Sequence, residues 1–285
     1  MHNSSPHLFY TSHSIQTSLK TLILGRRIEL HQQVGSTNDL AREAGRRGEP
    51  EGLVILAEEQ LAGRGRLGRT WSAPHGCCIL CSVLLRPRFS PEHAFYLTIA
   101  AALAIYRALK GSGIRDQGSG LNSNLTPSPW PLAPAIKWPN DVLVNGRKVC
   151  GILSESEFGG GEWAFAVVGF GINANLDPEE LGDLRDSATS LSAELGHSVD
   201  RAALLVRVLT EFESIYLSLQ SGQTGMVYRE WVAALETLGR RVTVEAPEGR
   251  LIGRAVRVEP DGALVLRLDS GEERRVLAGD VMLPG

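Results

Sequence analysis

The chain changes character at Leu238, and this change limits the possible folds more than any other feature of the sequence. From Leu238 onward, short apolar segments are separated at regular intervals by the turn sequences PEG, PDG and DSGE. Short strands at even spacing, with turn signals between them, are typical of small barrels and sandwiches. We therefore expect residues 238–285 to form a small β-barrel-like domain that follows a larger unit.

The larger unit mixes strand-like and helix-like segments, which predicts an α+β fold. A strand, a turn and a helix are expected in 27–52, and Ala94–Leu109 is apolar nearly all round, as a buried helix would be. Asn145–Gly146 is a strong turn signal between two strands. Further strands are expected at 52–60, 78–87 and 162–175, and two or three helices at 178–236.

Two segments are expected to lie outside the folded core. Residues 1–26 are largely polar and irregular, so we expect a weakly ordered N-terminal lead-in. Residues 111–135 are dominated by Gly, Ser, Asn and Pro, which favours a flexible surface loop. The larger domain is therefore expected to span residues 27–237.

Charge and hydropathy restrict the partners. The formal net charge of −3 argues against a broad nucleic-acid surface, which usually requires a basic domain. No stretch approaches the ~20 apolar residues needed to cross a bilayer. The N-terminus lacks the basic start and long apolar core of a signal peptide. We expect a cytoplasmic protein that binds no membrane.

The cysteines allow two interpretations. Cys77, Cys78 and Cys81 form the pattern CCILC, and Cys150 lies far away in the sequence. The pattern could indicate metal or redox chemistry, but no second Cys or His cluster completes a tetrahedral set. Because small buried cysteines are common in strands, we favour a core role with reduced thiols, as is usual in the cytoplasm.

Residues 63–71, GRGRLGRTW, place three arginines on a glycine-rich backbone, and we call this segment the arginine loop. Glycines let backbone N–H groups approach an anion, and guanidinium groups match phosphate or carboxylate oxygens. The alternative is a solvated loop with incidental charge. The segment is not a P-loop, because no Gly-Lys-Ser/Thr follows and the next element reads as a strand. A small anion is the favoured partner.

A second cluster is KWPND, Lys137–Asp141, followed by Lys148 in an otherwise apolar strand. Pro139 fixes the backbone. Asp141 beside Asn140 could bind Mg²⁺ together with phosphate oxygens, or it could cap a turn. A lysine in a mostly buried hairpin is explained better by an anionic ligand than by packing. This cluster therefore also indicates an anion site.

Two further motifs are weaker. The sequence GSTN, residues 35–38, offers hydroxyl and amide groups that could bind a small polar group, but capping of the following helix by Ser36 or Thr37 is the favoured interpretation. The sequence GFGINAN places Asn173 at the end of a strand, where a turn is the default interpretation.

The order of these motifs is more specific than any one of them. STN, EEQLAGRGRLGRTW, KWPNDVLVNGRKVCGIL and GFGINAN, in that order, resemble the biotin–protein ligase family over about Arg27–Gly285. The resemblance implies a mixed-sheet catalytic domain of the class II synthetase and biotin ligase type, followed by a small SH3-like β-barrel. The β-rich segment after Leu238 agrees with the second part.

The resemblance also implies a reaction. Biotin would be activated by ATP with Mg²⁺ as biotinyl-AMP, and a lysine of a biotin carboxyl carrier domain would then accept the biotin. Some family members carry an N-terminal helix-turn-helix domain that binds DNA. About 26 residues precede the motifs here, which is too few, so we expect the short form without DNA binding. The family includes monomers and dimers, and a homodimer remains open.

Residue roles follow from the resemblance alone. The catalytic residues would be Lys148, Arg64, Arg66 and Asp141. The biotin-binding residues would be Ser36, Thr37, Asn38, Gln60, Gly63, Arg64, Lys148 and Gly151. The ATP-binding residues would be Arg66, Arg69, Trp71, Lys137, Asn140 and Asn173. Asp141 would bind Mg²⁺ or take the proton of the acceptor lysine.

The sequence departs from the family pattern at two places, and two rival functions stay open. Leu67 stands where family members often have another basic residue, and residues 111–135 look long for the family, so we interpret them as an insertion remote from the site. The arginine loop is expected to close over the ligand and shield the reactive anhydride from water. One rival is a lipoate or octanoate transferase on the same fold, which would lack the paired GRGR and KWPND motifs. The other is a non-catalytic biotin sensor or interaction module.

Overall fold

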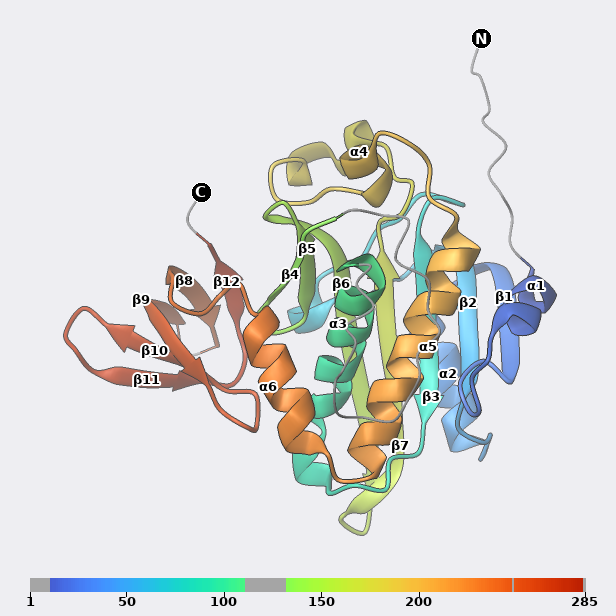
Figure 1. Ribbon diagram of the computed structural model, residues 1–285, viewed down its shortest axis with the longest axis horizontal. Coiled ribbons are helices and arrows are strands. Elements are labelled where there is room, and N and C mark those ends of the chain that lie inside the picture. The colour runs from blue at the N-terminus through green and yellow to red at the C-terminus, as the bar shows by residue number, and fades with distance from the viewer. Residues whose placement is uncertain (1–10, 111–131, 248, 284–285) are drawn as a thin grey trace.

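The computed structural model describes residues 11–110, 132–247 and 249–283. Within them, seven strands form the central sheet in the order β1-β2-β3-β7-β6-β5-β4 (Figure 1). β1 and β2 are parallel, whereas the other neighbouring strands are antiparallel, so the expected mixed sheet is confirmed. The strands are β1 (Arg27–Val34), β2 (Leu53–Gln60), β3 (Ile79–Leu85), β4 (Pro134–Lys137), β5 (Asp141–Val144), β6 (Arg147–Gly159) and β7 (Glu162–Ile172).

Helices cover both faces of this sheet (Figure 1). On one face, α2 (Thr37–Arg46) packs through Ala41 and Ala44 against a small cluster that includes Phe165. On the other face lie α3 (Phe95–Lys110), α5 (Arg201–Gln220) and α6 (Thr224–Ala234). Shorter helices are α1 (Ser12–Ser18), α4 (Leu191–Leu195) and the 3₁₀ turns Arg66–Gly68, Pro91–His93 and Pro178–Leu184.

Two expectations about the core are confirmed. α3 is buried along most of its length between the sheet and α5. β5 and β6 form a hairpin in which Asn145 and Gly146 have φ values of 51° and 76°. Two consecutive left-handed residues are what a tight two-residue hairpin turn requires, and Asn-Gly tolerates them best. This hairpin places Asp141 and Lys148 on neighbouring strands.

The N-terminal segment differs from the expectation of weak order. From Thr11 onward the chain folds: α1 buries Ile15, and the buried carboxylate of Glu213 accepts hydrogen bonds from the backbone N–H groups of residues 22–24 at 2.6–2.8 Å. A carboxylate on α5, nearly 190 residues away, satisfies these N–H groups. Such a distant partner leaves no local sequence signal. Residues 1–10 lie outside the described part of the chain.

Most of the expected insertion, residues 111–131, also lies outside the described residues. Its last part does not belong to a flexible segment, because Pro134 and Ala135 lie in β4 and pair with Val144 and Leu143.

The C-terminal segment forms an antiparallel sheet in the order β11-β10-β9-β8-β12 among the residues described. No pairing between the two edge strands β11 and β12 is found there, so a closed barrel is not seen. Trp138 joins this sheet to the larger unit, because its indole N–H donates to the carbonyl of Gly262 at 2.8 Å. The strands are β8 (Arg241–Ala246), β9 (Gly249–Val258), β10 (Leu264–Leu268), β11 (Glu273–Val276) and β12 (Asp280–Met282).

All four cysteines are buried and unbridged, as the core interpretation predicts. Burial raises the pKa of the Cys81 and Cys150 thiols well above the usual range. In the part of the chain that is described, no three His, Cys, Asp or Glu side chains are grouped so that they could hold a metal ion. Among the helices of the described residues, none has the length and hydropathy needed to span a bilayer.

Candidate active site

A cavity of about 870 Å³ lies between the sheet, the arginine loop and β12. It collects residues from all four sequence motifs, although these motifs are spread over about 140 positions. The predicted site residues that line it are Ser36, Thr37, Asn38, Gln60, Arg64, Arg66, Arg69, Trp71, Lys137, Asn140, Asp141, Lys148, Gly151 and Asn173.

At one end, the start of α2 meets the end of β2. Ser36 occupies the N-cap position, but its side chain makes no capping hydrogen bond in the described structure. Gln60 caps the helix instead, because its Oε1 accepts from the Thr37 backbone N–H at 2.7 Å and from the Thr37 hydroxyl at 3.0 Å. The expected capping by the Ser36 or Thr37 hydroxyl is therefore wrong. Because the side-chain oxygen of Gln60 accepts these two hydrogen bonds, its NH₂ group is left to donate to a ligand.

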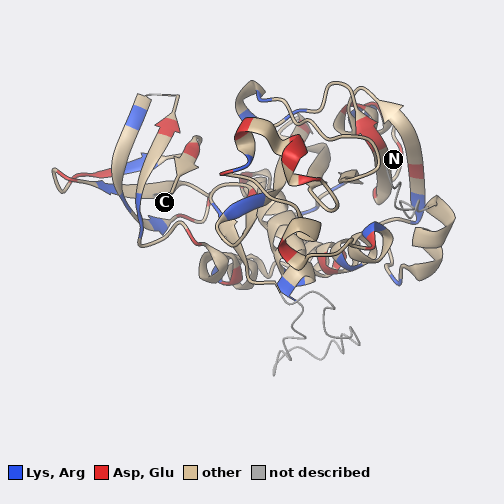
Figure 2. Cartoon of the chain, turned by 90° about the horizontal axis from the view of Figure 1, so that it is seen from above, with Lys and Arg blue, Asp and Glu red and all other residues tan. Residues whose placement is uncertain are grey.

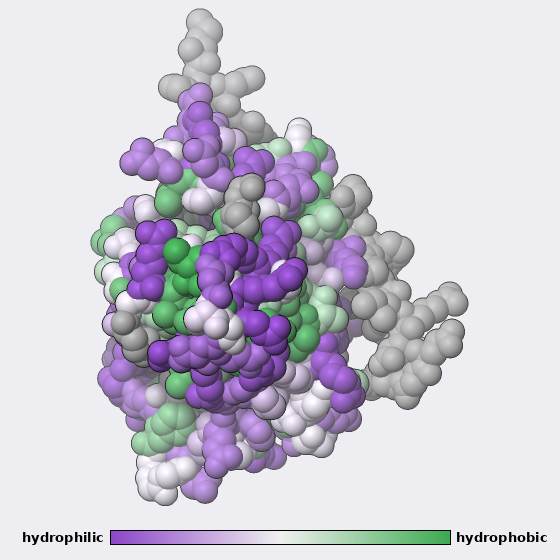
Figure 3. Space-filling model, turned by 90° about the vertical axis from the view of Figure 1, so that its left-hand side faces the viewer, coloured by the Kyte–Doolittle hydropathy of each residue, from purple (hydrophilic) through white to green (hydrophobic). Residues whose placement is uncertain are grey.

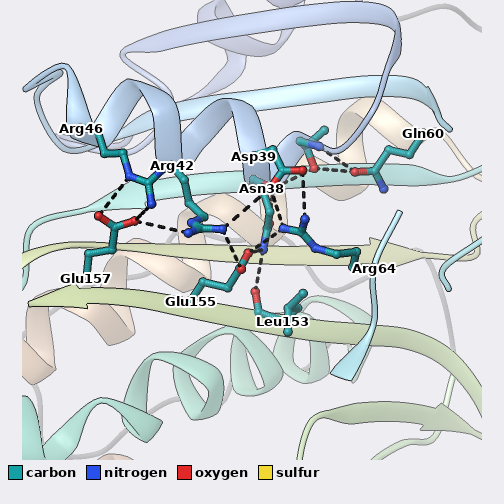
Figure 4. Close-up of polar contacts among 11 residues, drawn as sticks. Asn38, Asp39, Arg42, Arg46, Gln60, Arg64, Leu153, Glu155 and Glu157 are labelled. Atoms are coloured by element: carbon teal, nitrogen blue, oxygen red, sulfur yellow. Dashed lines mark hydrogen bonds and ion pairs between the residues drawn. The ribbon is translucent and has the colours of Figure 1, made fainter. Parts of the chain in front are cut away.

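Asn38 is held on all sides. Its Oδ1 lies 2.6 Å from the hydroxyl of Ser82, and its Nδ2 donates to Glu155 at 2.7 Å and to the carbonyl of Leu153 at 3.3 Å (Figure 4). A Cβ at Gly169 would lie 2.0 Å from Asn38 Oδ1, so only glycine leaves room for this amide. Asn38 therefore fixes the shape of this end of the cavity.

Arg64 continues this network toward solvent. Its guanidinium forms two hydrogen bonds to Asp39, at 2.7 and 3.0 Å, and lies 3.4 Å from Glu155 (Figure 4). The hydrogen bond to Asp39 raises the pKa of Arg64. Arg42 and Arg46 form ion pairs with Glu157 and so extend this network of charged side chains. An anionic ligand that engages Arg64 must therefore compete with carboxylates already in place.

The other two loop arginines have different environments. Arg66 is half-buried, and this burial lowers its pKa. Its Nη1 lies 3.5 Å from Asn140 Oδ1, a long contact that an anion could improve on. Arg69 is 64% exposed and forms an ion pair with Asp280 of β12. Between them, Leu67 has a φ of 55°, so a residue other than glycine adopts the left-handed conformation in the loop.

Asp141 lies between two lysines. Its Oδ1 is 2.7 Å from Lys148 Nζ, and its Oδ2 is 3.2 Å from Lys137 Nζ. Both carboxylate oxygens are therefore paired with ammonium groups, and the local charge is positive. This donor set does not fit a metal ion held by the protein, because such an ion would have to displace two cations from one carboxylate. It fits an anion that is bound by Lys137 and Lys148.

Trp71 forms a wall beside Lys148. Its ring lies against the backbone of Gly151 and Gly171, where a Cβ would come within 3.0 and 2.5 Å of ring atoms, and Lys148 Nζ lies 5.5 Å from the ring centre. The indole N–H is buried and has no hydrogen-bond partner among the described residues. Trp71 thus shares the region of the lysine and is poised to donate to a ligand there.

Gly63 and Asn173 have supporting positions. Gly63 falls outside the cavity lining in the described structure; a Cβ there would lie 2.4 Å from the Trp71 carbonyl oxygen, so Gly63 allows the two ends of the loop to pair. Asn173 lines the cavity, but its Nδ2 donates to the Thr189 carbonyl at 3.1 Å and its Oδ1 lies 3.8 Å from Cys78 Sγ.

Sequence reasoning missed several residues of the site. Ser82 carried a usable signal, since it is the one hydroxyl in the otherwise apolar segment Ile79–Leu85. Gly169 and Gly171 lie in the strand expected at 162–175, which is β7, but no signal in the sequence indicated their close approach to Asn38 and Trp71. Asp280 had no signal, because its importance depends on the placement of β12 beside the arginine loop.

Comparison with known proteins agrees with this geometry. A model described as the biotin/lipoate A/B protein ligase family matches residues 30–173, and one described as the biotin protein ligase C-terminal domain matches residues 237–283. Because the first match covers half of the chain, the chain belongs to the biotin/lipoate A/B protein ligase family.

Individual relatives cover almost the whole chain. A biotin--[acetyl-CoA-carboxylase] ligase of Mycobacterium tuberculosis is 34% identical over 276 residues, which is 94% of each protein. The bifunctional ligase/repressor BirA of Bacillus subtilis is 30% identical over 270 residues, 94% of this chain and 78% of that protein. The structure of a biotin protein ligase from Aquifex aeolicus in complex with biotin and ATP has a TM-score of 0.69 and 25% identity, covering 91% of this chain and 99% of that one.

Proposed function

We propose that this chain is a biotin–protein ligase. It activates biotin with ATP as biotinyl-AMP and transfers the biotin to a lysine of a biotin carboxyl carrier domain. One observation carries the proposal: a single cavity joins an end with neutral hydrogen-bonding groups to an end with five cationic side chains. The first suits an uncharged ring system, and the second suits a carboxylate and phosphates. The cationic side chains are Arg64, Arg66, Arg69, Lys137 and Lys148.

In the first step, an oxygen of the biotin carboxylate attacks the α-phosphorus of ATP, and the bond to pyrophosphate breaks. Both reactants are anions, so cations must offset their repulsion as charge builds on the phosphate oxygens. We assign this role to Lys148 and Arg66. The guanidinium of Arg66 is half-buried, and electrostatic interactions with an anion strengthen where water is partly excluded.

In the second step, the amine of the acceptor lysine attacks the carbonyl carbon of biotinyl-AMP, and AMP leaves with the bonding electrons. The attacking amine must lose a proton. We assign Asp141 as its acceptor, since this carboxylate is 7% exposed and lies 2.7 Å from Lys148. Before transfer, the same carboxylate holds Lys148 and Lys137 in the cavity.

Further parts of the proposal rest on the family resemblance. Mg²⁺ would arrive as part of the nucleotide substrate. The C-terminal sheet would belong to an SH3-like barrel. The protein would be cytoplasmic and could form a homodimer. The arginine loop would close over biotinyl-AMP, so that proteolysis within 63–70 slows when biotin and ATP are bound.

The first experiment is an adenylation assay without acceptor. Purified protein is mixed with Mg²⁺, ATP labelled at the α-phosphate, and either biotin or lipoate, and labelled adenylate is separated by thin-layer chromatography. We expect an adenylate that requires biotin. Adenylate with lipoate alone would assign the chain to the sister activity on this fold. Biotin binding without any adenylate would contradict an enzyme and favour a sensor.

A further inference from the structure

Glu155 places a carboxylate in the middle of β6, where it is half-buried. Charged residues of both signs occur on the C-terminal sheet and on the larger unit (Figure 2), and the side of the molecule shown in Figure 3 is mostly hydrophilic. Glu155 has less access to water than such surface groups, so it needs partners within the protein. Its neighbour Ser154 contacts Thr98 of α3 at 3.0 Å. Glu155 therefore points to the other face of the sheet, where α2 lies.

Three donors converge on the Glu155 carboxylate (Figure 4). The shortest contact is with the neutral amide of Asn38, whose Nδ2 donates to Oε2 at 2.7 Å. The guanidinium groups of Arg42 and Arg64 lie further away, at 3.4 Å, and both also pair with other carboxylates. Glu155 does not line the cavity in the described structure, whereas Asn38 does. Its strongest route to a ligand therefore runs through the Asn38 amide.

The contact with Glu155 decides which way this amide points. Nδ2 of Asn38 faces Glu155 at 2.7 Å and the carbonyl of Leu153 at 3.3 Å, and both of these groups can only accept. This end of the amide must therefore be its NH₂ group, which leaves Oδ1 facing the Ser82 hydroxyl at 2.6 Å. A hydrogen bond to a charged acceptor is stronger than one between neutral groups, so Glu155 holds the orientation more firmly than the Leu153 carbonyl does.

Two hydroxyl groups carry this orientation to the cavity. Because Asn38 Oδ1 can only accept, the single proton of the Ser82 hydroxyl is directed to it. Ser82 Oγ also lies 2.8 Å from Thr37 Oγ1, and two hydroxyl oxygens at this distance need a proton between them, which Thr37 must supply. The Thr37 proton thus points into the protein, toward Ser82 Oγ and toward Gln60 Oε1 at 3.0 Å. Thr37 lines the cavity, so its oxygen presents lone pairs to a ligand.

We propose that Glu155 is a positioning residue for biotin; this inference rests on the function proposed above. By orienting Asn38, the Glu155 carboxylate makes the Thr37 hydroxyl an acceptor for one N–H group of the ureido ring of biotin. The NH₂ group of Gln60 is a donor beside it, so the two residues match the adjacent N–H and C=O groups of a cyclic urea. With the amide turned over, Ser82 would donate to Thr37, and the Thr37 proton could then go to the ligand.

The test measures binding to the full chain by calorimetry without ATP. The ligands are biotin and two analogues, in which an oxygen atom replaces one or the other ureido N–H group. One analogue places its oxygen against the Thr37 oxygen, and the wild-type protein should bind it roughly 10–100-fold more weakly than biotin, because a buried acceptor loses its donor. Glu155→Met lets the Asn38 amide turn and should reduce this preference about fivefold.

Two further variants follow the same chain of hydrogen bonds. Glu155→Gln keeps a carbonyl oxygen that can accept from Asn38, so it should retain most of the preference for biotin. Ser82→Ala removes the next link and releases the Thr37 proton, so it should reduce the preference as Glu155→Met does. Because Ser82→Ala is a small change, the test does not depend on the folding of the methionine variant.

Two control variants separate the amide from the arginines. Glu157→Met removes a carboxylate from the same face of β6 that also pairs with Arg42, but Glu157 has no contact with Asn38 among the described residues. Asp39→Asn weakens the hold on Arg64 and leaves the Asn38 amide in place. Both should keep the wild-type preference between biotin and the analogue.

Three results would overturn the inference. The preference could stay unchanged in folded Glu155→Met or, if that variant does not fold, in Ser82→Ala. Biotin and both analogues could weaken by the same factor, which would make Glu155 a general support of the fold. The preference could also fall equally in Glu157→Met or Asp39→Asn, so that charge near the arginines would explain it. Failure of the proposed function looks different, because the wild-type protein would then bind no biotin.

Discussion

The two ends of the cavity are built in opposite ways. At the α2 end, Thr37, Asn38 and Ser82 are buried, and hydrogen bonds of 2.6–3.0 Å join them to one another and to Gln60. At the loop end, Arg64 and Arg69 have side chains that are 39% and 64% exposed, and carboxylates pair with both of them.

This difference separates two modes of recognition. The α2 end is shaped before any ligand arrives, so the fit of a neutral group there depends on geometry. At the loop end, the arginines are already paired with groups that resemble the ligand. These groups are the carboxylates of Asp39, Glu155 and Asp280, whose oxygens are like those of a ligand carboxylate or phosphate. Binding at that end is therefore an exchange of anions, and its strength depends on charge.

The largest effect is expected where the two ends meet. Lys148→Ala removes the ammonium group beside Asp141 and should slow biotinyl-AMP formation by roughly 10²–10³-fold, as for other groups that stabilise developing charge. Biotin affinity should fall much less. Single-turnover release of pyrophosphate measures the first quantity, and calorimetry measures the second. Lys110→Ala, at the exposed end of α3, is the control. Equal losses of rate and affinity would contradict a role in the reaction itself.

The second prediction tests the preformed end. Gly169→Ala places a Cβ 2.0 Å from Asn38 Oδ1 and must push this amide away from Ser82. Overpacking of this kind costs about 1–3 kcal/mol, so biotin should bind roughly 10–100-fold more weakly. Gly159→Ala, also in the sheet, is the control, because a Cβ there meets no described atom within 4 Å. Unchanged biotin binding in Gly169→Ala would show that this end adapts and is not preformed.

The sequence predicted which residues line the cavity better than it predicted the partners with which their side chains pair. Thr37, Gln60 and Lys148 follow from motifs, since the order of short motifs along the chain is visible in the sequence. The partners of the loop arginines do not follow, because the helix α2 offers both Asp39 and Glu43, and because Asp280 belongs to another sheet.

The same reason explains the largest error in the fold. The segment that ends at Leu24 looks irregular, and its order depends on Glu213, a single carboxylate on a distant helix. Local patterns report local hydrogen bonds and periodic burial. They do not report a partner that becomes a neighbour only through the tertiary fold.

The third prediction concerns a variant in which one carboxylate no longer competes with an anionic ligand for Arg64 at the loop end. Asp39→Asn keeps the shape of the side chain but removes the charge that holds Arg64. Exposed ion pairs are worth about 0.2–1 kcal/mol, so the KM for ATP or biotin should fall by a factor of up to about five. Glu43→Gln is the control on the same helix, because Glu43 pairs only with Arg47 among the described residues. An increase in KM would instead make Asp39 part of the binding surface.

The smallest expected effect is that of salt, and it compares the two ends within one wild-type protein. Raising ionic strength from about 0.1 to 0.5 M shortens the Debye length from about 10 Å to less than half of that, which screens the exposed arginines. The KM for ATP should therefore rise a few-fold. The affinity for biotin should change less, because most of its expected contacts are neutral hydrogen bonds around Thr37 and Gln60. Only the carboxylate of biotin is expected to contact a charged group, Lys148. If salt weakened both ligands equally, the contrast between a geometric end and an electrostatic end would be wrong, and charge would govern the whole cavity.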